Sequence, residues 1–390
     1  MKRGLIALLL AYVLSQFYRA FLPVLAPVLA VDIGASPDDL ARASGLWFLA
    51  FAAMQIPVGA ALDRIGPRRT AAILFILGGA GGATVFALAQ TPAHVTWAMI
   101  LLGIGCSPVL MASYFIIARA YAPAVFATAA GALIGIGSIG NLAGSAPMAW
   151  AVDVLGWRMA MVWLAAVSGV VGVLLVAMVR DPAKIETTQQ GSVLQLLKMP
   201  ALWPIFALML VNYAPAAALR GLWAGPYVAD VYGADVTTIG QVTLVMALAM
   251  IAASFAYGPL ERLFKTRKWV VFAGNASGAL ALGALWAAPD QGILFATIML
   301  AIVGISGSTF PLLVAHAKAS FPPHLTGRGV TLMNLFGIGG VGVMQFATGP
   351  IHAASITPTP SDAFAVLFAV FAVIVTLGLL AYVWSADRTD

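Results

Sequence analysis

The chain has 390 residues, of which 62% are hydrophobic and 9% are charged, and its mean hydropathy is +0.99. This composition excludes a soluble globular domain and indicates a protein with many membrane-spanning helices. The net charge of +6 does not indicate a nucleic-acid-binding protein, because the basic residues lie in short gaps between apolar runs and form no basic stripe.

Long apolar runs predict an all-α membrane protein with twelve transmembrane helices, since about 20 apolar residues cross a bilayer. The predicted spans are 5–30, 41–62, 70–90, 94–119, 124–151, 157–180, 201–229, 239–260, 269–288, 291–317, 328–352 and 362–384. Basic residues gather in the segments between alternate spans, and the other loops hold only Arg42 and Arg158. This positive-inside bias predicts a multi-pass protein of the bacterial inner membrane, surrounded by lipid, with both termini in the cytoplasm.

Arg19 lies in the middle of the first apolar run, about 21 Å along a helix from Leu5. An arginine in hydrocarbon is costly, so it normally faces the protein interior or a watery cavity and marks a substrate pathway. Arg220, in the seventh predicted span, lies comparably deep.

The longest polar gap divides the chain into two halves of six spans each. We predict a first six-helix bundle over 1–180, a cytoplasmic linker over 181–200 and a second bundle over 201–390. A weak repeat agrees, because the segments 27–35 and 226–234 share Pro, Ala, Gly and Ala at an offset of 199 residues. Arg19 and Arg220 are then nearly equivalent positions, and in transporters built this way such helices face each other across a cavity in the membrane.

The loop after the second span reads Gly59-Ala-Ala-Leu-Asp-Arg-Ile-Gly-Pro-Arg-Arg69, which resembles the G-x-L-a-D-r-x-G-r-(k/r) loop of the major facilitator superfamily (MFS). A degenerate copy, 258–268, follows in the second half. The resemblance covers the whole chain and implies two pseudo-symmetric six-helix bundles, a monomer and transport by alternating access.

A carboxylate beside basic residues at a helix end can bind a neighbouring helix in one conformation and release it in the other. The residues that we predict to act in gating are Asp63, Arg64, Arg68, Glu261 and Arg262. These basic clusters can alternatively serve topology alone.

Glycines in the fifth span, Gly137, Gly140 and Gly144, have the small-xxx-small spacing that lets helices approach closely. This run and the Gly-Trp-Arg segment at 156–158 are similar to the glycine-rich fifth helix and GWR ending of the superfamily. The pair Gly140-Asn141 also resembles the signature of nitrate porters. Packing is the default interpretation of these glycines.

All fourteen acidic residues can be placed in loops or at helix ends, so the membrane interior carries two arginines and no carboxylate to pair with them. Guanidinium stays charged on burial, and its planar fork of N–H donors binds carboxylate or phosphate in bidentate fashion. Two such forks from the two halves could clamp one anion. Arginines on helices 1 and 7 also resemble the organophosphate/phosphate antiporters and related organic-anion transporters, which implies an anion-binding role for Arg19 and Arg220. The alternative is that either arginine bonds helix carbonyls or extends to the interface.

Side chains on the same helical faces complete the predicted site. Besides the two arginines, the predicted substrate-binding residues are Tyr12, Gln16, Tyr114, Asn212, Tyr213, Trp223, Thr309 and Asn334. Simple packing would also explain each of these side chains. His316 is a candidate for proton coupling, although it could equally be an interfacial histidine.

The sequence therefore predicts a secondary transporter of small organic carboxylates or phosphates that works by anion exchange or by proton-coupled uptake. No P-loop, HExxH motif or nucleophile elbow is present, so neither an enzyme nor a cofactor or metal is expected. A drug/proton antiporter is an alternative that predicts intramembrane acids. A nitrate/nitrite transporter is another, favoured by Gly140-Asn141, but that family carries its arginines on helices 2 and 8.

Overall fold

The structure is a computed structural model that describes residues 2–120, 133, 135–182, 193–322, 325–355 and 359–387, and every regular element in these ranges is helical. The chain folds into two compact units. The first comprises Met1–Glu186 with Asp235–Gln241, and the second comprises Thr187–Ala234 with Val242–Asp390. The domain boundaries predicted above stay a prediction, since residues 183–192 of the predicted linker lie outside the described residues.

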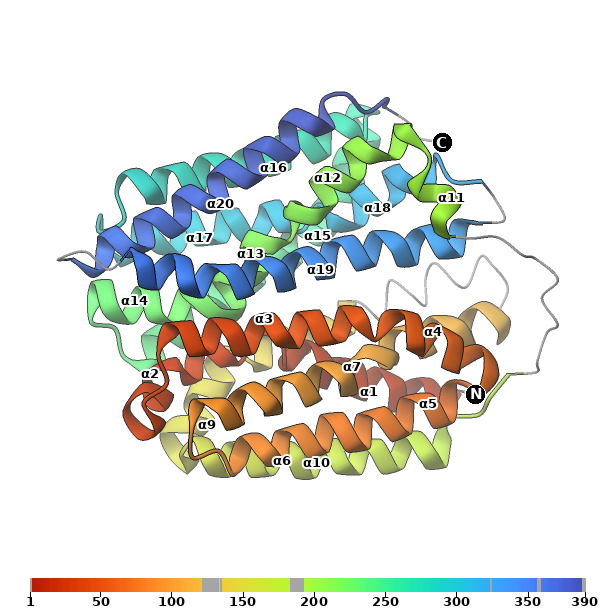
Figure 1. Cartoon of the computed structure of the whole chain (residues 1–390), viewed down its shortest axis with the longest axis horizontal. Helices are drawn as coiled ribbons and strands as arrows, with labels where there is room; N and C mark the ends of the chain where they lie inside the picture. The colour runs from red at the N-terminus through yellow and green to blue at the C-terminus, as the bar shows by residue number, and fades with distance from the viewer. Residues whose placement is uncertain are drawn as a thin grey trace. The chain divides into compact units, whose positions relative to one another are not determined.

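The helices of the first unit, coloured from red to yellow-green in Figure 1, run alongside one another. They are α1 (Lys2–Phe17), α2 (Leu22–Ile33), α3 (Pro37–Ala53), α4 (Gln55–Arg64), α5 (Pro67–Leu74), the π-helical η1 (Phe75–Ala80), α6 (Gly81–Ala87), α7 (Pro92–Ala120), α9 (Ala146–Leu155) and α10 (Trp157–Met178). Residues 135–143 are also helical.

The second unit, green to blue in Figure 1, is built in the same way from helices that pack lengthwise. Its elements are α11 (Val193–Leu197), the 3-10 turn η2 (Pro200–Leu202), α12 (Trp203–Asn212), α13 (Ala214–Ala218), the π-helical η3 (Leu219–Trp223), α14 (Ala224–Tyr232), α15 (Val236–Phe264), α16 (Lys268–Ala287), α17 (Ile293–Gly307), α18 (Phe310–Lys318), α19 (Thr326–Ala354) and α20 (Pro360–Tyr382). The first residues of α15 belong to the first unit.

The predicted all-α membrane fold is confirmed. Among the described residues, ten helices are long and apolar enough to cross a membrane, and α1 and α2 together form an eleventh span with a bend of 53°. The predicted span 124–151 lies partly outside the described residues, so the count is consistent with the twelve spans that the sequence predicts.

The prediction of one continuous first helix over 5–30 is wrong. α1 ends at Phe17 and α2 begins at Leu22. Pro23 explains the break, because it has no backbone N–H and its ring would clash with the carbonyl group of Arg19, four residues earlier. The break places Arg19 on irregular backbone between two half-helices.

The seventh span is interrupted at the corresponding place. Arg220 lies in η3, a π-helical turn that separates α13 from α14. Pro226 follows this turn, and in a regular helix its ring would clash with the carbonyl group of Leu222. π-Turns are uncommon and often occur at functional sites. Both deep arginines are therefore held by interrupted helices, each followed closely by a proline.

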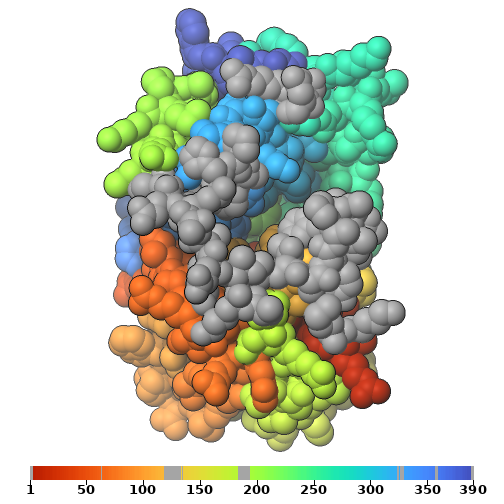
Figure 2. Space-filling model, turned by 90° about the vertical axis from the view of Figure 1, so that its right-hand side faces the viewer, coloured from red at the N-terminus to blue at the C-terminus, as the bar shows by residue number. Residues whose placement is uncertain are grey.

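An aspartate in each unit ties the end of the last helix to the start of another. Asp181, after α10, accepts the amide hydrogen of Arg68 at 2.8 Å. Asp387, after α20, accepts those of Lys268 and Arg267 at 3.0 and 3.2 Å. A carboxylate at a helix N-terminus satisfies free N–H groups and complements the helix dipole. In Figure 2, orange and yellow-green segments of the first unit lie side by side on this face of the molecule.

Candidate functional site

Arg19 is half-buried, and its guanidinium lies over two aromatic rings of α3. Its Cζ atom is 4.7 Å from the ring centre of Phe51 and 5.3 Å from that of Trp47. The Nε atom is buried without a hydrogen-bond partner, and among the described residues no acidic side chain forms an ion pair with Arg19. Aromatic faces stabilise a cation without neutralising it. Arg19 therefore keeps an uncompensated positive charge inside the span.

Trp47 and Phe51 are functional candidates that we did not predict from the sequence. They are four residues apart on α3, their rings stack at 5.3 Å, and they are 0% and 3% exposed. Aromatic residues at this spacing share one face of a helix. The spacing is visible in the sequence, but it does not show which other helix the pair faces.

Two predicted substrate residues share the face of α1 that leads to Arg19. Gln16 donates a hydrogen bond from Nε2 to the hydroxyl oxygen of Tyr12 at 3.2 Å. Tyr114, half-buried on α7, lies close enough to Tyr12 for the two phenol groups to interact electrostatically. Cys106 of the same helix lies close enough to Arg19 for the two side chains to interact electrostatically. The predicted residues of the first unit thus gather around the broken span.

Arg220 is almost completely buried, at 2% exposure, within the second unit. One face of α19 packs on the π-turn that holds it. Gln345 donates from Nε2 to the carbonyl oxygen of Ala217 at 3.2 Å, and the indole N–H of Trp223 donates to Thr348 Oγ1 at 2.9 Å. Trp223, a predicted substrate residue, is itself 0% exposed and is fixed by this bond.

Asn212 and Thr309, predicted from different spans, meet in a buried cluster with Asn275 of α16. Asn212 Nδ2 donates to Asn275 Oδ1 at 2.8 Å and to Thr309 Oγ1 at 2.6 Å. Asn275 Nδ2 donates to Thr309 Oγ1 at 2.9 Å and to the carbonyl oxygen of Val271 at 2.8 Å. Thr309 Oγ1 donates to the carbonyl oxygen of Ser306 at 2.8 Å. These bonds cross-link α12, α16 and the break between α17 and α18. No pattern in the sequence links Asn275 to the other two.

Two further predicted residues of the second unit are more accessible. Tyr213 is half-buried at the end of α12, and its ring contacts that of Phe310 edge-on with ring centres 5.8 Å apart. Asn334 is half-buried on α19. Their roles in substrate binding stay predictions.

Of the predicted gating residues, the side chain of Asp63 lies outside the described part of the chain, and Arg64 and Arg262 are exposed. Arg68 is tied within the first unit, because its Nε donates to the carbonyl oxygen of Val176 at 2.7 Å in addition to the bond from its backbone to Asp181. Glu261 pairs with Arg267, with 2.7 Å between Oε1 and Nε, rather than with its sequence neighbour Arg262. The sequence did not identify this partner.

His316, the predicted proton-coupling residue, is fully buried and has a partner at each ring nitrogen. Nδ1 lies 2.7 Å from the hydroxyl of Tyr382, and Nε2 lies 2.7 Å from the carbonyl oxygen of Ala386. Because a carbonyl oxygen only accepts, the neutral ring carries its hydrogen on Nε2 and accepts from Tyr382 at Nδ1. This ring fastens the segment after α20 to α18.

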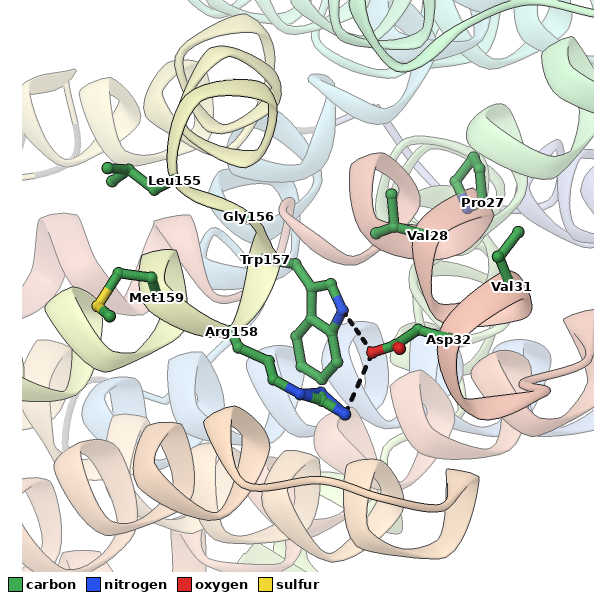
Figure 3. A pocket seen from close by; sticks show the side chains of 9 residues that line it. All are labelled: Pro27, Val28, Val31, Asp32, Leu155, Gly156, Trp157, Arg158 and Met159. Carbon is green, nitrogen blue, oxygen red and sulfur yellow. Dashed lines mark hydrogen bonds and ion pairs between the residues drawn. The ribbon is translucent and has the colours of Figure 1, made fainter.

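An open pocket of about 700 Å³ lies in the first unit, away from all of these residues. Figure 3 shows Asp32 at its centre, accepting hydrogen bonds from the indole of Trp157 at 3.0 Å and from Arg158 Nη2 at 3.1 Å. Arg158 also lies over the ring of Trp157, 4.2 Å from its centre. The residues of the GWR segment therefore tie α10 to the end of α2. None of the predicted substrate residues lines this pocket.

These features define a polytopic helical membrane protein of two units, each with an arginine on an interrupted helix. The model of the Major Facilitator Superfamily matches residues 8–344, so the chain belongs to that superfamily. It is therefore a multi-pass transporter of small molecules rather than an enzyme.

Solved structures of transporters resemble the chain over its whole length. The D-xylose-proton symporter is 15% identical, with a TM-score of 0.79 over 99% of this chain and 98% of that chain. A bacterial homologue of the human lysosomal transporter Spinster, in an inward-facing and unoccupied conformation, is 18% identical, with a TM-score of 0.74 over 97% of both chains. The nucleoside transporter NupG is 13% identical, with a TM-score of 0.75 over 98% of this chain and 99% of that chain. At these identities the likeness shows the fold alone. No curated protein matches the chain.

Proposed function

We propose that this transporter carries small anions of the carboxylate or phosphate type, and that Arg19 and Arg220 bind them. Arg19 is the observation on which the proposal depends. Guanidinium stays charged on burial, yet the group lies over two aromatic rings and forms no ion pair among the described residues. Its N–H donors form no hydrogen bond within the described chain, so a bound anion would supply the missing counter-charge.

The distribution of acidic residues supports an anionic substrate. In the described spans, the acidic residues Asp32, Asp38, Asp39, Asp230, Glu261 and Asp362 all lie within about one turn of a span end. The interior of these spans thus offers no carboxylate for a cationic substrate. A drug/proton antiporter, the alternative from a different substrate class, would need such a group.

Arg220 extends the proposal to the second unit. Its burial in the π-turn and its position in the repeat correspond to the placement of Arg19 at the break of the first span. We propose that both arginines bind the same anion, and that Tyr12, Gln16, Tyr114, Tyr213 and Asn334 contribute hydrogen bonds or aromatic contact. Transport would proceed by anion exchange or by proton-coupled uptake across a bacterial inner membrane, with both termini in the cytoplasm and the chain acting as a monomer. The gating roles of Asp63, Arg64, Arg68, Glu261 and Arg262 belong to the same proposal.

Nitrate or nitrite transport is a second candidate, which the pair Gly140-Asn141 favours. A Cβ atom at Gly140 would lie 1.9 Å from the carbonyl oxygen of Val13, so helix packing already explains this glycine. Nitrate is planar and accepts hydrogen bonds as a carboxylate does, so it belongs in the same binding experiment.

The proposal is tested by thermal unfolding of the purified protein with succinate, inorganic phosphate, a sulfonate, nitrate and a hydrophobic cation. A ligand at 100 times its Kd stabilises the folded state by about 2.7 kcal/mol, which is a measurable rise in Tm. We expect one class of anion to raise the Tm of the wild type, and the R19Q and R220Q variants to lose that response. If the two arginines bind one ligand, the R19Q/R220Q double variant should show no loss of response beyond that of either single variant.

The R42Q variant is the matched control. Arg42 is exposed and bonds Asp38 at 2.8 Å one turn away on α3, so its replacement should leave the response to anions intact. A response to the hydrophobic cation alone, or an anion response that survives in both R19Q and R220Q, would contradict the proposal.

A further inference from the structure

His352 is a buried histidine whose ring lies between two aromatic side chains of the second unit. It is 8% exposed and lies in the last turn of α19. The centre of its ring is 4.8 Å from that of Trp223 and 4.7 Å from that of Phe364. No role was predicted for it from the sequence.

The Nε2 atom of His352 is buried and has no hydrogen-bond partner within the described chain. His316 is the contrasting case, because both of its ring nitrogens are bonded. A buried polar atom without a partner costs about 1–3 kcal/mol. The Nε2 atom of His352 therefore takes no part in holding the second unit together by hydrogen bonds within the described chain.

The face of α19 that carries His352 also holds the π-turn of Arg220. Gln345, Thr348 and His352 are spaced three and four residues apart, so they share one side of the helix. They contact, in order, the carbonyl oxygen of Ala217, the indole N–H of Trp223 and the ring of Trp223. A change in the charge of His352 would thus act directly on the turn that holds Arg220.

The ionisable groups on the elements around His352 are few. They are Arg220 on η3, Tyr227, Asp230 and Tyr232 on α14, and Asp362 and Tyr382 on α20. Within the described chain, none of them forms a hydrogen bond or an ion pair with His352. Tyr227 instead bonds the carbonyl oxygen of Pro289, and Asp362 accepts from Thr359.

Opposing effects act on the charged form of the ring. Burial disfavours imidazolium, whereas the face of Trp223 and the carbonyl end of α19 favour it. Histidine is the side chain that ordinarily changes its protonation between pH 5 and 8, which makes His352 a candidate for binding a proton.

We propose that His352 is a proton-binding residue, and that its protonation is coupled through Trp223 to anion binding at Arg220. The coupling rests on the function proposed above, whereas proton binding itself does not. The lone pair of Nε2 takes a proton from solvent, and the ring becomes imidazolium. An anion at Arg220 adds negative charge nearby, so it favours this step, and by linkage the proton favours the anion to the same degree. Anion and proton would then bind together, as proton-coupled uptake requires.

The test is NMR titration of the purified full-length chain labelled with ¹³C and ¹⁵N at histidine, from pH 5 to pH 9. The four histidines are assigned by H94Q, H316Q, H324Q and H352Q, and if one variant fails to fold, the other three assign the remaining signal by elimination. We expect His352 to titrate within roughly pH 5 to 8 and His316 to stay neutral over that range. R220Q removes a neighbouring positive charge, so it should move the midpoint of His352 upward by roughly half a pH unit. Succinate or inorganic phosphate, whichever binds, should also move it upward in the wild type.

A His352 ring that stays neutral down to pH 5 would overturn the proposal, whether or not any anion binds. A midpoint that neither R220Q nor the bound anion changes would overturn the coupling. If His352 titrates and responds to R220Q while neither anion binds the wild type, proton binding and its link to Arg220 stand, and the assigned substrate class fails.

Discussion

Gly140 and Gly340, 200 residues apart, each allow a neighbouring backbone to approach at the same place in its unit. A Cβ atom on Gly140 would lie 1.9 Å from the carbonyl oxygen of Val13, and one on Gly340 would lie 1.8 Å from that of Leu210. The partner segments are α1 and α12, which lead to Arg19 and Arg220. The packing interpretation of Gly140 in the fifth span agrees with this close approach, and the same contact at Gly340 was not predicted. Both contacts position the interrupted helices.

Replacing Gly340 should therefore destabilise the protein, because the added methyl group would overlap a backbone atom that cannot rotate away. We expect G340A to lower the free energy of unfolding by about 1–3 kcal/mol and to lower Tm. Gly339 provides a matched control on the same helix, since a Cβ atom there would have nothing within 4 Å. Thermal unfolding of G340A and G339A distinguishes the clash with the backbone of Leu210 from the general effect of adding a methyl group to α19. Equal Tm values would show that the close approach does not constrain the fold.

The planar fork of Arg19, and not its charge alone, should determine anion affinity. R19K keeps the positive charge but loses the paired N–H donors, so we expect binding of a carboxylate or phosphate to weaken about tenfold. The Tm of the ligand-free variant should hardly change, because Arg19 forms no ion pair within the described chain. Isothermal titration with the anion that stabilises the wild type measures the difference. An affinity for R19K equal to that of the wild type would exclude bidentate recognition by Arg19.

Asp387 should make stability depend on pH at the acidic end. Burial raises its pKa, but hydrogen bonds from the hydroxyl of Thr266 and from the amides of Lys268 and Arg267 outweigh this and leave the pKa below its usual value. A lowered folded-state pKa stabilises the protein above the ordinary aspartate value of about 3.9, and this stabilisation is lost as pH falls through the folded-state pKa. D387N should lower Tm near neutral pH and lose less Tm than the wild type on acidification.

The comparison is made by measuring Tm from pH 7 to pH 3. D290N is the control, because Asp290 is exposed and caps no helix, and its profile should follow that of the wild type. If D387N lost Tm on acidification as steeply as the wild type does, the helix-capping role of Asp387 would be contradicted.

The sequence predicted most of the fold because hydrophobic length is a strong signal in a membrane protein. Ten spans and the position of the deep arginines follow from runs of apolar residues, which need no partner to be recognised. The break at Arg19 was within reach as well, since Pro23 stands four residues later. Pro226 likewise indicates an interruption after Arg220, but no residue pattern shows that the interruption takes the form of a π-turn.

The side-chain partners that could not be predicted from the sequence depend on contacts between different spans. The pairing of Glu261 with Arg267, and the position of Trp47 beside Arg19, depend on which helix faces touch. Buried polar atoms without a hydrogen-bond partner, such as Nε2 of His352, can also be found only in the three-dimensional structure. Periodicity defines a face on each helix, but with many helices in a chain it leaves the pairing of those faces open.

The cluster of Asn212, Asn275 and Thr309 offers a final test, which separates a structural role from the predicted role in substrate binding. Thr309 Oγ1 accepts hydrogen bonds from both asparagines and donates one to the carbonyl oxygen of Ser306. T309V removes all three bonds in a site with 0% exposure, so we expect it to lower the free energy of unfolding by about 2–4 kcal/mol. T84V is the matched control, because Thr84 is exposed and bonds only the carbonyl oxygen of Ala80, one turn earlier, and its effect should stay within about 0.5 kcal/mol. A T309V variant that kept the wild-type Tm but lost anion binding would assign Thr309 to the substrate and not to the fold.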